Sequence, residues 1–432
     1  MGLPTAAPPD DPIAPAPAPV APSSTPLGQG VTAADRVVSS AIRDLLEIAG
    51  RPDVLSLAGG LPDVGLLDQD RFRAAAEAAA SATGPNGPVA LQYGPTAGVP
   101  ALREAVAERL GVGPDEVVVT TGSQQGLDLL ARALCAPGDV VALQEPAYLG
   151  AVQAFRAAGA RVVGVPGDDE GMDVDALAGM IRRGLRPRAV YVVADHHNPT
   201  GAVLSPGRRH RLRALVAEHD VRLVEDAAYR DLHWGPPTRA LFRGNGDTGS
   251  GDGAGAAPQV VHLGSSSKVL APGLRVGWLA GPAAVRDAVV RLKQTSDLHT
   301  PTWNQLVVAH LLTDPHHAAH LEHLRREARR RCHALHRALT SELGDRVRLT
   351  SPDGGMFLWL EATDGTDTDA LLGRAIDAGV AFVPGSAFAV PADPTSGLPA
   401  TSWANTARLS FATQDPDGLR TAAARLASVW PS

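Results

Sequence analysis

The stretch VVHLGSSSKVLAPGLRVGWLAG, at residues 260–281, consists of two short apolar runs joined by a turn that carries hydroxyls, a lysine and an arginine. Runs this short and this continuously apolar are typical of strands that are covered on both faces. Similar runs precede it, separated by helical stretches, among them EVVVT, DVVAL, ARVVGV, AVYVVA and VRLVED. Because helices between buried strands act as crossovers, the pattern predicts an α/β fold with a mostly parallel sheet.

The turn inside this stretch contains Ser265, Ser267, Lys268 and Arg275. Small hydroxyls and an arginine can hold a phosphate, and a lysine beside them can form a Schiff base with an aldehyde. Pyridoxal 5'-phosphate is an aldehyde cofactor that carries both groups. A surface lysine in a serine-rich turn is the alternative explanation, and this segment alone leaves it open.

The composition is that of a globular protein of 432 residues, with 44% hydrophobic and 20% charged residues, and the length suits two domains. The net charge of −7 argues against nucleic acid as a partner. The two cysteines, Cys135 and Cys332, make neither a disulfide framework nor a metal site. No secretory signal and no apolar stretch of transmembrane length is present, so we expect a cytoplasmic protein without membrane contacts.

Composition and periodicity predict four parts along the chain. Residues 1–30 are rich in proline and alanine and are expected to be disordered. Residues 31–61 are expected to form an N-terminal arm that joins the smaller domain. The large domain is placed at residues 62–305, with a flexible glycine-rich insertion at 244–258. Strand-like runs mixed with helices predict a small α+β domain at residues 306–432.

Two segments at the ends of predicted strands could bind a cofactor. VTTGSQQGLDLL places Ser123 and Gln124 between a strand and a helix, where backbone N–H groups form an anion site. AVYVVADHHNPTG ends its strand near Asn198, whose amide could donate to a phenolic oxygen at the ligand-binding edge of the sheet. Each segment also has an ordinary explanation, as a small-residue turn or an Asn-Pro turn.

Two further segments carry charged groups. VRLVEDAAYR ends a strand at Asp226, with Tyr229 soon after it. A carboxylate there can keep a pyridine nitrogen protonated, because opposite charges favour both ionised forms, and Tyr229 could reach the same phenolic oxygen as Asn198. NTARLSFA carries Arg408, whose guanidinium could bind a carboxylate with two hydrogen bonds. A strand-end cap, a core tyrosine and a surface arginine on an edge strand are the alternatives.

In their order and spacing, Asn198, Asp226, Tyr229, Lys268 and Arg275 resemble the class I/II aminotransferases, which are fold type I pyridoxal phosphate enzymes. The resemblance extends over nearly everything but the tail and is strengthened by the phrases SLAGGLPD, LQYGPTAGVPALREAVAERL, GDVVALQEPAYLGAVQAF and GGMFLW. SAIRDLLEIAGRPDVLSLAGGLPD is similar to the 2-aminoadipate aminotransferase branch, which also supplies the catalytic-like half of MocR-type regulators. The resemblance implies a large domain with a mostly parallel seven-stranded sheet covered by helices, and a smaller α+β domain.

The resemblance also implies a reaction and residue roles. The enzyme would move an amino group from an α-amino acid to a 2-oxo acid through a Schiff base on Lys268, which also shuttles the α-proton. Asp226 would pair with the pyridine nitrogen, Asn198 and Tyr229 would hold the phenolic oxygen, and Tyr148 would stack on the ring. The residues implied for the phosphate are Ser123, Gln124, Ser265, Ser267 and Arg275.

Substrate and partner contacts follow from the same resemblance. Arg408 would bind the substrate carboxylate, and Gly60 lies in the segment that closes over the substrate. Arg43 matches a position that contacts a distal substrate carboxylate, although an arginine on the water-facing side of an amphipathic helix is an equal alternative. Tyr93 matches a tyrosine that reaches the phosphate of a neighbouring subunit, which implies a homodimer with shared active sites.

The sequence departs from the family phrase immediately before Asn198, where Ala194, Asp195, His196 and His197 replace a stretch that usually has a proline and a glutamine. His197 stands in the place of the glutamine. We expect it to pack beside the ring, and a second acid or base near neutrality is the alternative. The departure motivates a rival function, a pyridoxal phosphate-dependent oxidase, eliminase or cyclase in specialised biosynthesis. A DNA-binding regulator is disfavoured, because only a proline-rich tail precedes the predicted fold.

A long basic helix after Pro301 carries His316, His320 and His323 on one face and an arginine-rich run at residues 325–331. The histidine spacing could gather a metal, but no carboxylate or cysteine pattern completes a site. We therefore expect no metal, and we expect both groups to lie on a solvated helix face.

Overall fold

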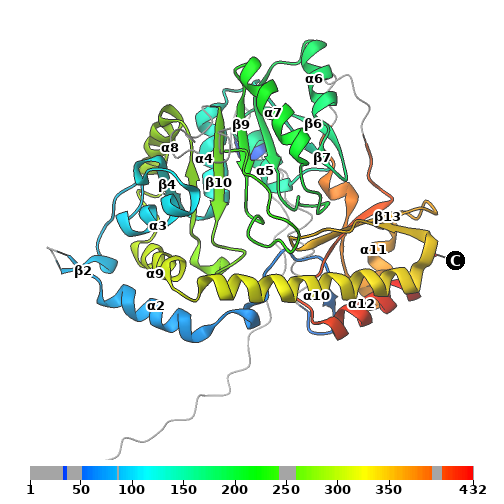
Figure 1. Cartoon of the computed structure of the whole chain (residues 1–432). Coiled ribbons are helices and arrows are strands. Elements are labelled where there is room, and N and C mark those ends of the chain that lie inside the picture. The colour runs from blue at the N-terminus through cyan, green and yellow to red at the C-terminus, as the bar shows by residue number, and fades with distance from the viewer. Residues whose placement is uncertain (1–32, 37–50, 85–86, 243–258, 392–400, 432) are drawn as a thin grey trace, which may run out of the picture.

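The computed structural model describes residues 33–36, 51–84, 87–242, 259–391 and 401–431 (Figure 1). The predicted tail at 1–30, the predicted insertion at 244–258 and Arg43 lie outside the described residues. Within the described part, no helix combines the length and the apolar character that crossing a membrane requires.

An eight-stranded sheet forms the centre of the larger part of the molecule. Its strands pair in parallel except for β11, which is antiparallel to both neighbours, and β7, a two-residue strand that turns back on β6. The prediction of a mostly parallel sheet is confirmed, and β7 adds a short strand to the expected seven. In spatial order the strands are β4 (Val117–Thr120), β11 (Gly277–Ala280), β10 (Val260–Ser265), β9 (Arg222–Asp226), β8 (Pro187–Val193), β5 (Val140–Glu145), β6 (Arg161–Asp168) and β7 (Gly171–Met172).

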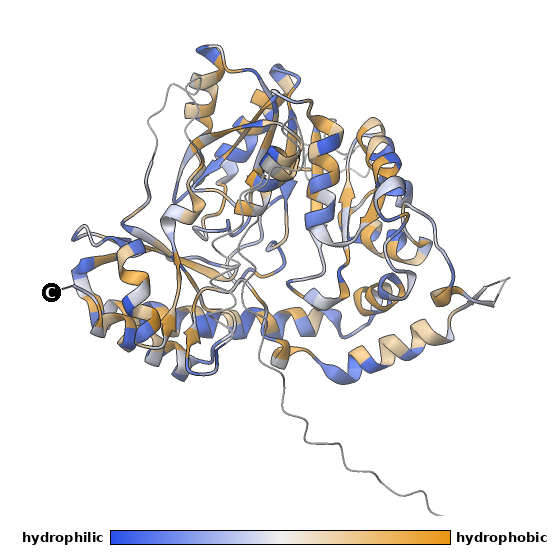
Figure 2. Cartoon of the chain, turned by 180° about the vertical axis from the view of Figure 1, so that it is seen from behind, coloured by the Kyte–Doolittle hydropathy of each residue, from blue (hydrophilic) through white to orange (hydrophobic). Residues whose placement is uncertain are grey.

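Helices cover both faces of this sheet, which is why its strands are apolar throughout (Figure 1). Alternate side chains of one strand enter different core clusters: Tyr191 lies in one cluster, whereas Val190 and Val192 lie in the other. The helices of this part are α2 (Gln69–Ser81), α3 (Pro100–Leu110), α4 (Gly122–Leu134), α5 (Leu149–Ala157), α6 (Val174–Arg182), α7 (Pro206–Glu218), α8 (Ala283–Ser296) and α9 (Thr302–Thr313). Their hydrophilic faces point outward (Figure 2).

A second sheet of four strands forms the smaller part, with helices packed against it. The strand β1 (Leu55–Ser56) of the N-terminal arm pairs in parallel with β14 (Val380–Ala381), next to this sheet. The long helix α10 runs beneath both parts (Figure 1). The elements are β12 (Val347–Leu349), β13 (Phe357–Ala362), β16 (Thr406–Ser410) and β15 (Val383–Pro384) in spatial order, with α10 (His317–Leu343), α11 (Thr368–Asp377) and α12 (Pro416–Ser428).

Short elements complete the described chain. The hairpin of β2 and β3 is separate from both sheets. The short elements are β2 (Thr83–Gly84), β3 (Gly87–Pro88), η1 (Ala34–Arg36), η2 (Val64–Leu66), η3 (Val89–Leu91), η4 (Pro114–Glu116), η5 (Pro272–Leu274), η6 (Gly344–Arg346) and η7 (Gly385–Phe388).

The division into domains can be argued from the core clusters. The sheet of the smaller part has a core of its own, which includes Leu335, Leu358 and Leu409. The expected boundary between residues 305 and 306 falls inside α9, whose Val308 belongs to the core of the large sheet. We propose that the small domain begins at α10.

Candidate active site

The predicted cofactor residues lie where the parallel strands of the large sheet end. Asp226 is the last residue of β9, Ser265 is the last residue of β10, and Asn198 follows β8. Ser123 lies in the first turn of α4, directly after β4. Because β4, β8, β9 and β10 run in the same direction, their carboxyl ends bring these four side chains to one edge of the sheet.

The turn at the start of α4 approaches Arg275 closely. Gly122 has a φ of 77°, and a Cβ atom added there would lie 2.5 Å from Nη2 of Arg275. A glycine is therefore required both by the backbone conformation and by the guanidinium. The N–H groups at the start of α4 and the Arg275 guanidinium beside Gly122 are together suited to an anion.

Lys268 follows the turn after β10, where Ser267 is buried and its N–H donates to Oγ of Ser265 over 3.1 Å. The Lys268 ammonium donates to the carbonyl oxygen of Gly60 over 2.9 Å and lies 5.7 Å from the centre of the Tyr229 ring. Burial and the positive charges of Arg408 and Arg275 lower the pKa of Lys268 to about 8, against the opposing effect of Asp226. A substantial fraction of this amine is therefore neutral near physiological pH.

Asp226 is buried, and both of its carboxylate oxygens accept hydrogen bonds. Oδ2 accepts from the phenol of Tyr191 over 2.7 Å, and Oδ1 accepts from the N–H of Ala228 over 3.2 Å. Burial raises the pKa of Asp226, and these two hydrogen bonds oppose that rise.

Tyr191 was not among the residues predicted from sequence, because it stands in the apolar run AVYVVA and resembles a core residue. Two signals point to it. A buried tyrosine hydroxyl requires a partner. In the sheet, Tyr191 is paired with Val224, so it lies on the same face as Asp226, two residues further along β9.

Two more aromatic residues line the edge. The hydroxyl of Tyr148 donates to Oε1 of Gln124 over 3.0 Å, which joins the N-cap of α5 to the first turn of α4. The Asn198 amide lies 3.5 Å from the hydroxyl of Tyr229, and both side chains are buried. Tyr229 also packs edge-on against Phe357 of the small sheet.

Arg408 lies on β16, between β13 and β15, and is 4% exposed, so the alternative of a surface arginine on an edge strand is wrong. Its Nη1 donates to Oδ1 of Asn198 over 2.9 Å and its Nη2 donates to the carbonyl oxygen of Ala58 over 2.5 Å. The guanidinium lies over the ring of Phe357, 4.4 Å from its centre, while Nε has no hydrogen-bond partner. Burial lowers the pKa of Arg408 to about 10.

Tyr93 and Gly60, two further residues predicted for the site, lie in different surroundings. Tyr93 is 79% exposed and contacts His299 edge-on, with ring centres 5.7 Å apart. Gly60 lies opposite Lys268, and a Cβ atom added there would lie 2.9 Å from the Phe357 ring. Gly60 thus lies beside the amine of Lys268 in the same chain, whereas Tyr93 faces outward.

The histidines before Asn198 are buried. Nδ1 of His197 interacts with Oγ1 of Thr200 over 2.9 Å and with the amide of Gln144 over 3.3 Å. Burial lowers the pKa of His197 to about 3, so the ring is neutral at physiological pH. This supports packing and argues against a second acid or base near neutrality. Burial likewise lowers the pKa of His196 to about 4.

The expectation of a solvated face on α10 is wrong for two of its members. His320 is buried, and its Nε2 interacts with the carbonyl oxygen of Val269, the residue after Lys268, over 2.8 Å. Arg331 is buried and donates to Asp63 over 2.7 Å. The reason is that α10 lies beneath both domains, so part of its polar surface is covered. Among the described residues, no group of three or more His, Cys, Asp or Glu could hold a metal ion.

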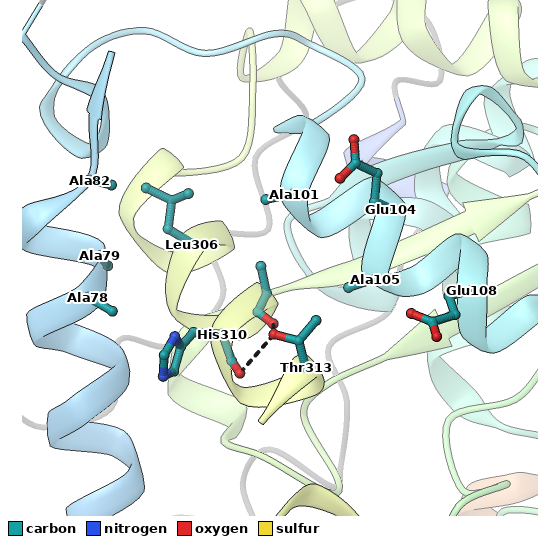
Figure 3. A pocket seen from close by; sticks show the side chains of 11 residues that line it. Ala78, Ala79, Ala82, Ala101, Glu104, Ala105, Glu108, Leu306, His310 and Thr313 are labelled. Atoms are coloured by element: carbon teal, nitrogen blue, oxygen red, sulfur yellow. Dashed lines mark hydrogen bonds between the residues drawn. The ribbon is translucent and has the colours of Figure 1, made fainter. Parts of the chain in front are cut away.

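A separate pocket of about 460 Å³ lies between α2, α3 and α9 (Figure 3). Its walls are mainly small apolar side chains such as Ala79 and Ala105, with Glu104 and Glu108 on α3. None of the residues predicted for the active site lines it.

The edge of the large sheet matches the chemical groups of pyridoxal phosphate. The turn at Gly122 and Arg275 suits its phosphate, the partly neutral amine of Lys268 suits its aldehyde, and the buried Asp226 suits its pyridine nitrogen. The donors around Asn198 and Tyr229 suit its phenolic oxygen. The residues present therefore fit this cofactor.

The sequence matches the family model described as aminotransferase class I and II over residues 52–426. It is 42% identical to a 2-aminoadipate transaminase of Thermus thermophilus, over 91% of this chain and 94% of that protein. It is 34% identical to aromatic-amino-acid aminotransferase 1 of Thermococcus litoralis, over 90% of this chain and 91% of that protein.

A solved structure agrees with the sequence comparisons. The fold matches the alpha-aminoadipate aminotransferase of Thermus thermophilus complexed with N-(5'-phosphopyridoxyl)-L-leucine, with a TM-score of 0.81 and 40% identity, covering 92% of this chain and 96% of that chain. The chain therefore belongs to the aminotransferase class I and II family and is a pyridoxal phosphate-dependent aminotransferase.

Proposed function

We propose that this aminotransferase attaches its cofactor to Lys268 and takes 2-aminoadipate or a related dicarboxylic amino acid as amino donor. The observation that carries the attachment is the amine itself, which is held at the sheet edge with a pKa lowered to about 8 by burial and by Arg408 and Arg275. The name of the 42% identical relative supports the substrate.

The proposed cofactor contacts follow from the geometry. Asp226, whose ionised form the Tyr191 hydrogen bond favours against the effect of burial, would hold the proton on the pyridine nitrogen. When bound, the cofactor's protonated ring accepts the electron pair that is released at the substrate α-carbon. Asn198 and Tyr229 would hold the phenolic oxygen, and Tyr148 would pack against the ring. The phosphate is held by Ser123, Gln124, Ser265, Ser267 and Arg275.

Lys268 then acts as the base at the α-carbon. Its Nζ would hold and move the α-proton, a role that requires the neutral amine. The nearby cations Arg408 and Arg275 favour that neutral form.

Arg408 binds the α-carboxylate of the substrate. Its cation–π contacts with Phe357 and Phe388 hold the guanidinium in an enclosed position, and its Nε is a donor without a partner, so a carboxylate would interact strongly there. The carboxylate would replace the carbonyl oxygen of Ala58 as its partner. For the distal carboxylate we propose Arg43.

We propose that the enzyme works in the cytoplasm as a homodimer with shared active sites. Support for the dimer comes from large apolar side chains at the surface: Leu91 is 82% exposed, Tyr93 is 79% exposed and Val64 is 64% exposed. A second copy of the chain would cover this surface, and Tyr93 would reach the phosphate of that copy.

Amino transfer assays test the proposed substrate. With 2-oxoglutarate as acceptor, kcat/KM for 2-aminoadipate is expected to exceed the values for phenylalanine and leucine. Oxygen consumption is measured in the same reactions, because an oxidase would consume oxygen without a 2-oxo acid. Higher kcat/KM for phenylalanine would overturn the dicarboxylic substrate, and oxygen-dependent turnover would favour the rival function.

A further inference from the structure

Lys293, near the end of α8, is fully buried, which is unusual for a lysine. Its ammonium has polar partners on every side: Oδ1 and Oδ2 of Asp297 at 2.8 and 2.9 Å, Oε1 of Gln125 at 3.0 Å, and Oγ1 of Thr300 at 3.1 Å. A buried ammonium is costly unless it is paired and hydrogen-bonded in this way. The amine is thus part of a built polar cluster and not a surface group that is covered by chance.

The same cluster contacts the turn at the start of α4. Oδ2 of Asp297 accepts from the hydroxyl of Thr121 over 2.7 Å and from the amide of Gln125 over 2.6 Å. Oε1 of Gln125 in turn accepts from the backbone N–H of Thr121 over 2.7 Å. Thr121 is the N-cap of α4, immediately before Gly122 and the proposed phosphate residues.

These hydrogen bonds occupy the polar groups of Thr121, so a ligand at the start of α4 would bind to the N–H groups that follow Thr121. The N–H of Thr121 is bound from the protein interior by Gln125, and its hydroxyl is bound by Asp297. The helix start that follows it, at Gly122 and Ser123, lies beside Arg275 and Gly277, and its N–H groups are ones that have no partner within the helix.

We propose that Lys293 and Asp297 are positioning residues for cofactor binding: through Gln125 and Thr121 they fix the turn that receives the phosphate. This inference rests on the proposed function, because it assumes that the turn binds the cofactor's phosphate. It extends that function to two residues of α8 and its C-cap that touch neither cofactor nor substrate.

A merely structural ion pair would also stabilise the fold, so the test must be specific for the phosphate. Dissociation constants are measured on the cofactor-free protein for pyridoxal 5'-phosphate and for pyridoxal, which lacks the phosphate, by the visible absorbance of the bound aldehyde. The dissociation constant for pyridoxal divided by that for pyridoxal 5'-phosphate reports how much the phosphate contributes to binding. Melting temperatures are recorded for every variant.

The variants are Lys293→Met, Asp297→Asn and Thr121→Val, the last of which removes only one hydroxyl. Each is expected to reduce the phosphate-dependent ratio about tenfold, the effect of one or two lost hydrogen bonds to charged groups. The matched control is Arg71→Met, which breaks another largely buried ion pair of the large domain, with Asp314 at 3.2 Å, and is expected to keep the wild-type ratio.

Equal losses of affinity for both aldehydes, or an unchanged ratio in all three variants, would overturn the proposal. If Lys293→Met fails to fold, the ratios of Thr121→Val and Asp297→Asn test the proposal. A different result would contradict the proposed function itself. The wild-type protein would then bind both aldehydes with the same affinity, and Arg275→Met would leave the ratio unchanged.

Discussion

The phenol of Tyr191 donates a hydrogen bond to the buried carboxylate of Asp226 over 2.7 Å, from the strand next to it in the sheet. Burial raises the pKa of Asp226, and the Tyr191 hydrogen bond acts in the opposite direction. Tyr191 therefore helps to keep a negative charge at a place where an isolated carboxylate would favour its neutral form. That charge is what a protonated pyridine nitrogen requires.

Replacing Tyr191 with phenylalanine is expected to weaken pyridoxal phosphate binding about 10-fold or more, because a hydrogen bond to a charged group contributes about 1.5–3 kcal/mol. Turnover is expected to fall with it, since the carboxylate becomes easier to protonate. Absorbance titration and steady-state rates measure the two effects. In an Asp226→Asn background the same change should add little, and a full additional loss would show that Tyr191 acts elsewhere.

His197 offers a test of the rival chemistry. Because burial lowers its pKa to about 3, the ring is neutral across the working range and contributes no proton transfer there. We expect His197→Gln to retain amino transfer within about threefold, as a packing change without a lost charge. Its pH–rate profile should have the same inflections as the wild type. Loss of an inflection near pH 6 to 7 would instead identify His197 as an acid or base.

The lowered pKa of Lys268 predicts the pH dependence of cofactor capture. A protonated amine does not attack an aldehyde, and burial with Arg408 and Arg275 nearby lowers the pKa of this amine to about 8. The rate at which cofactor-free enzyme takes up pyridoxal phosphate should therefore rise with pH, with a midpoint near 8, and level off above it. Stopped-flow absorbance measures the rate. A midpoint at the ordinary lysine value of about 10.4 would contradict the role of these neighbours.

Arg408→Lys is expected to raise KM for the amino acid about 100-fold, because a point charge replaces a planar donor pair in a buried site. Cofactor affinity should change much less, since Arg408 hydrogen-bonds only to Asn198 among the proposed cofactor residues and a lysine keeps the positive charge near Lys268. Arg348→Lys, at an arginine whose side chain is 77% exposed, is the matched control and should leave KM unchanged. If Arg408→Lys lowered only kcat, the carboxylate would bind elsewhere.

Much of the fold is predictable from local sequence. Continuously apolar runs such as AVYVVA become strands with core clusters on both faces, because crossover helices cover both sides. The residues at the strand ends, including Asn198 and Asp226, then meet at one edge for a purely topological reason. The two-residue strand β7 is not predictable in this way, since it is too short to show a periodic pattern of apolar residues.

Contacts between distant segments explain the remaining differences. His320 and Lys293 both lie on helices whose composition suggests solvent, yet both are buried by segments far away in the chain. The sequence around Tyr191 predicts a core residue, and only the pairing of β8 with β9 places its side chain beside Asp226. Periodicity reports which side of a helix or strand is apolar, but it does not report which polar side chain a neighbouring element will cover.

The attachment of the cofactor at Lys268 is tested most directly by reducing the loaded enzyme with borohydride and mapping the modified peptide by mass spectrometry. The expected result is one phosphopyridoxyl group, on Lys268, in the wild type and none in Lys268→Ala. The full sequence contains one other lysine, Lys293, whose buried ammonium is hydrogen-bonded to Asp297, Gln125 and Thr300. A stoichiometric modification at any other lysine, or in the Lys268→Ala variant, would contradict the assignment.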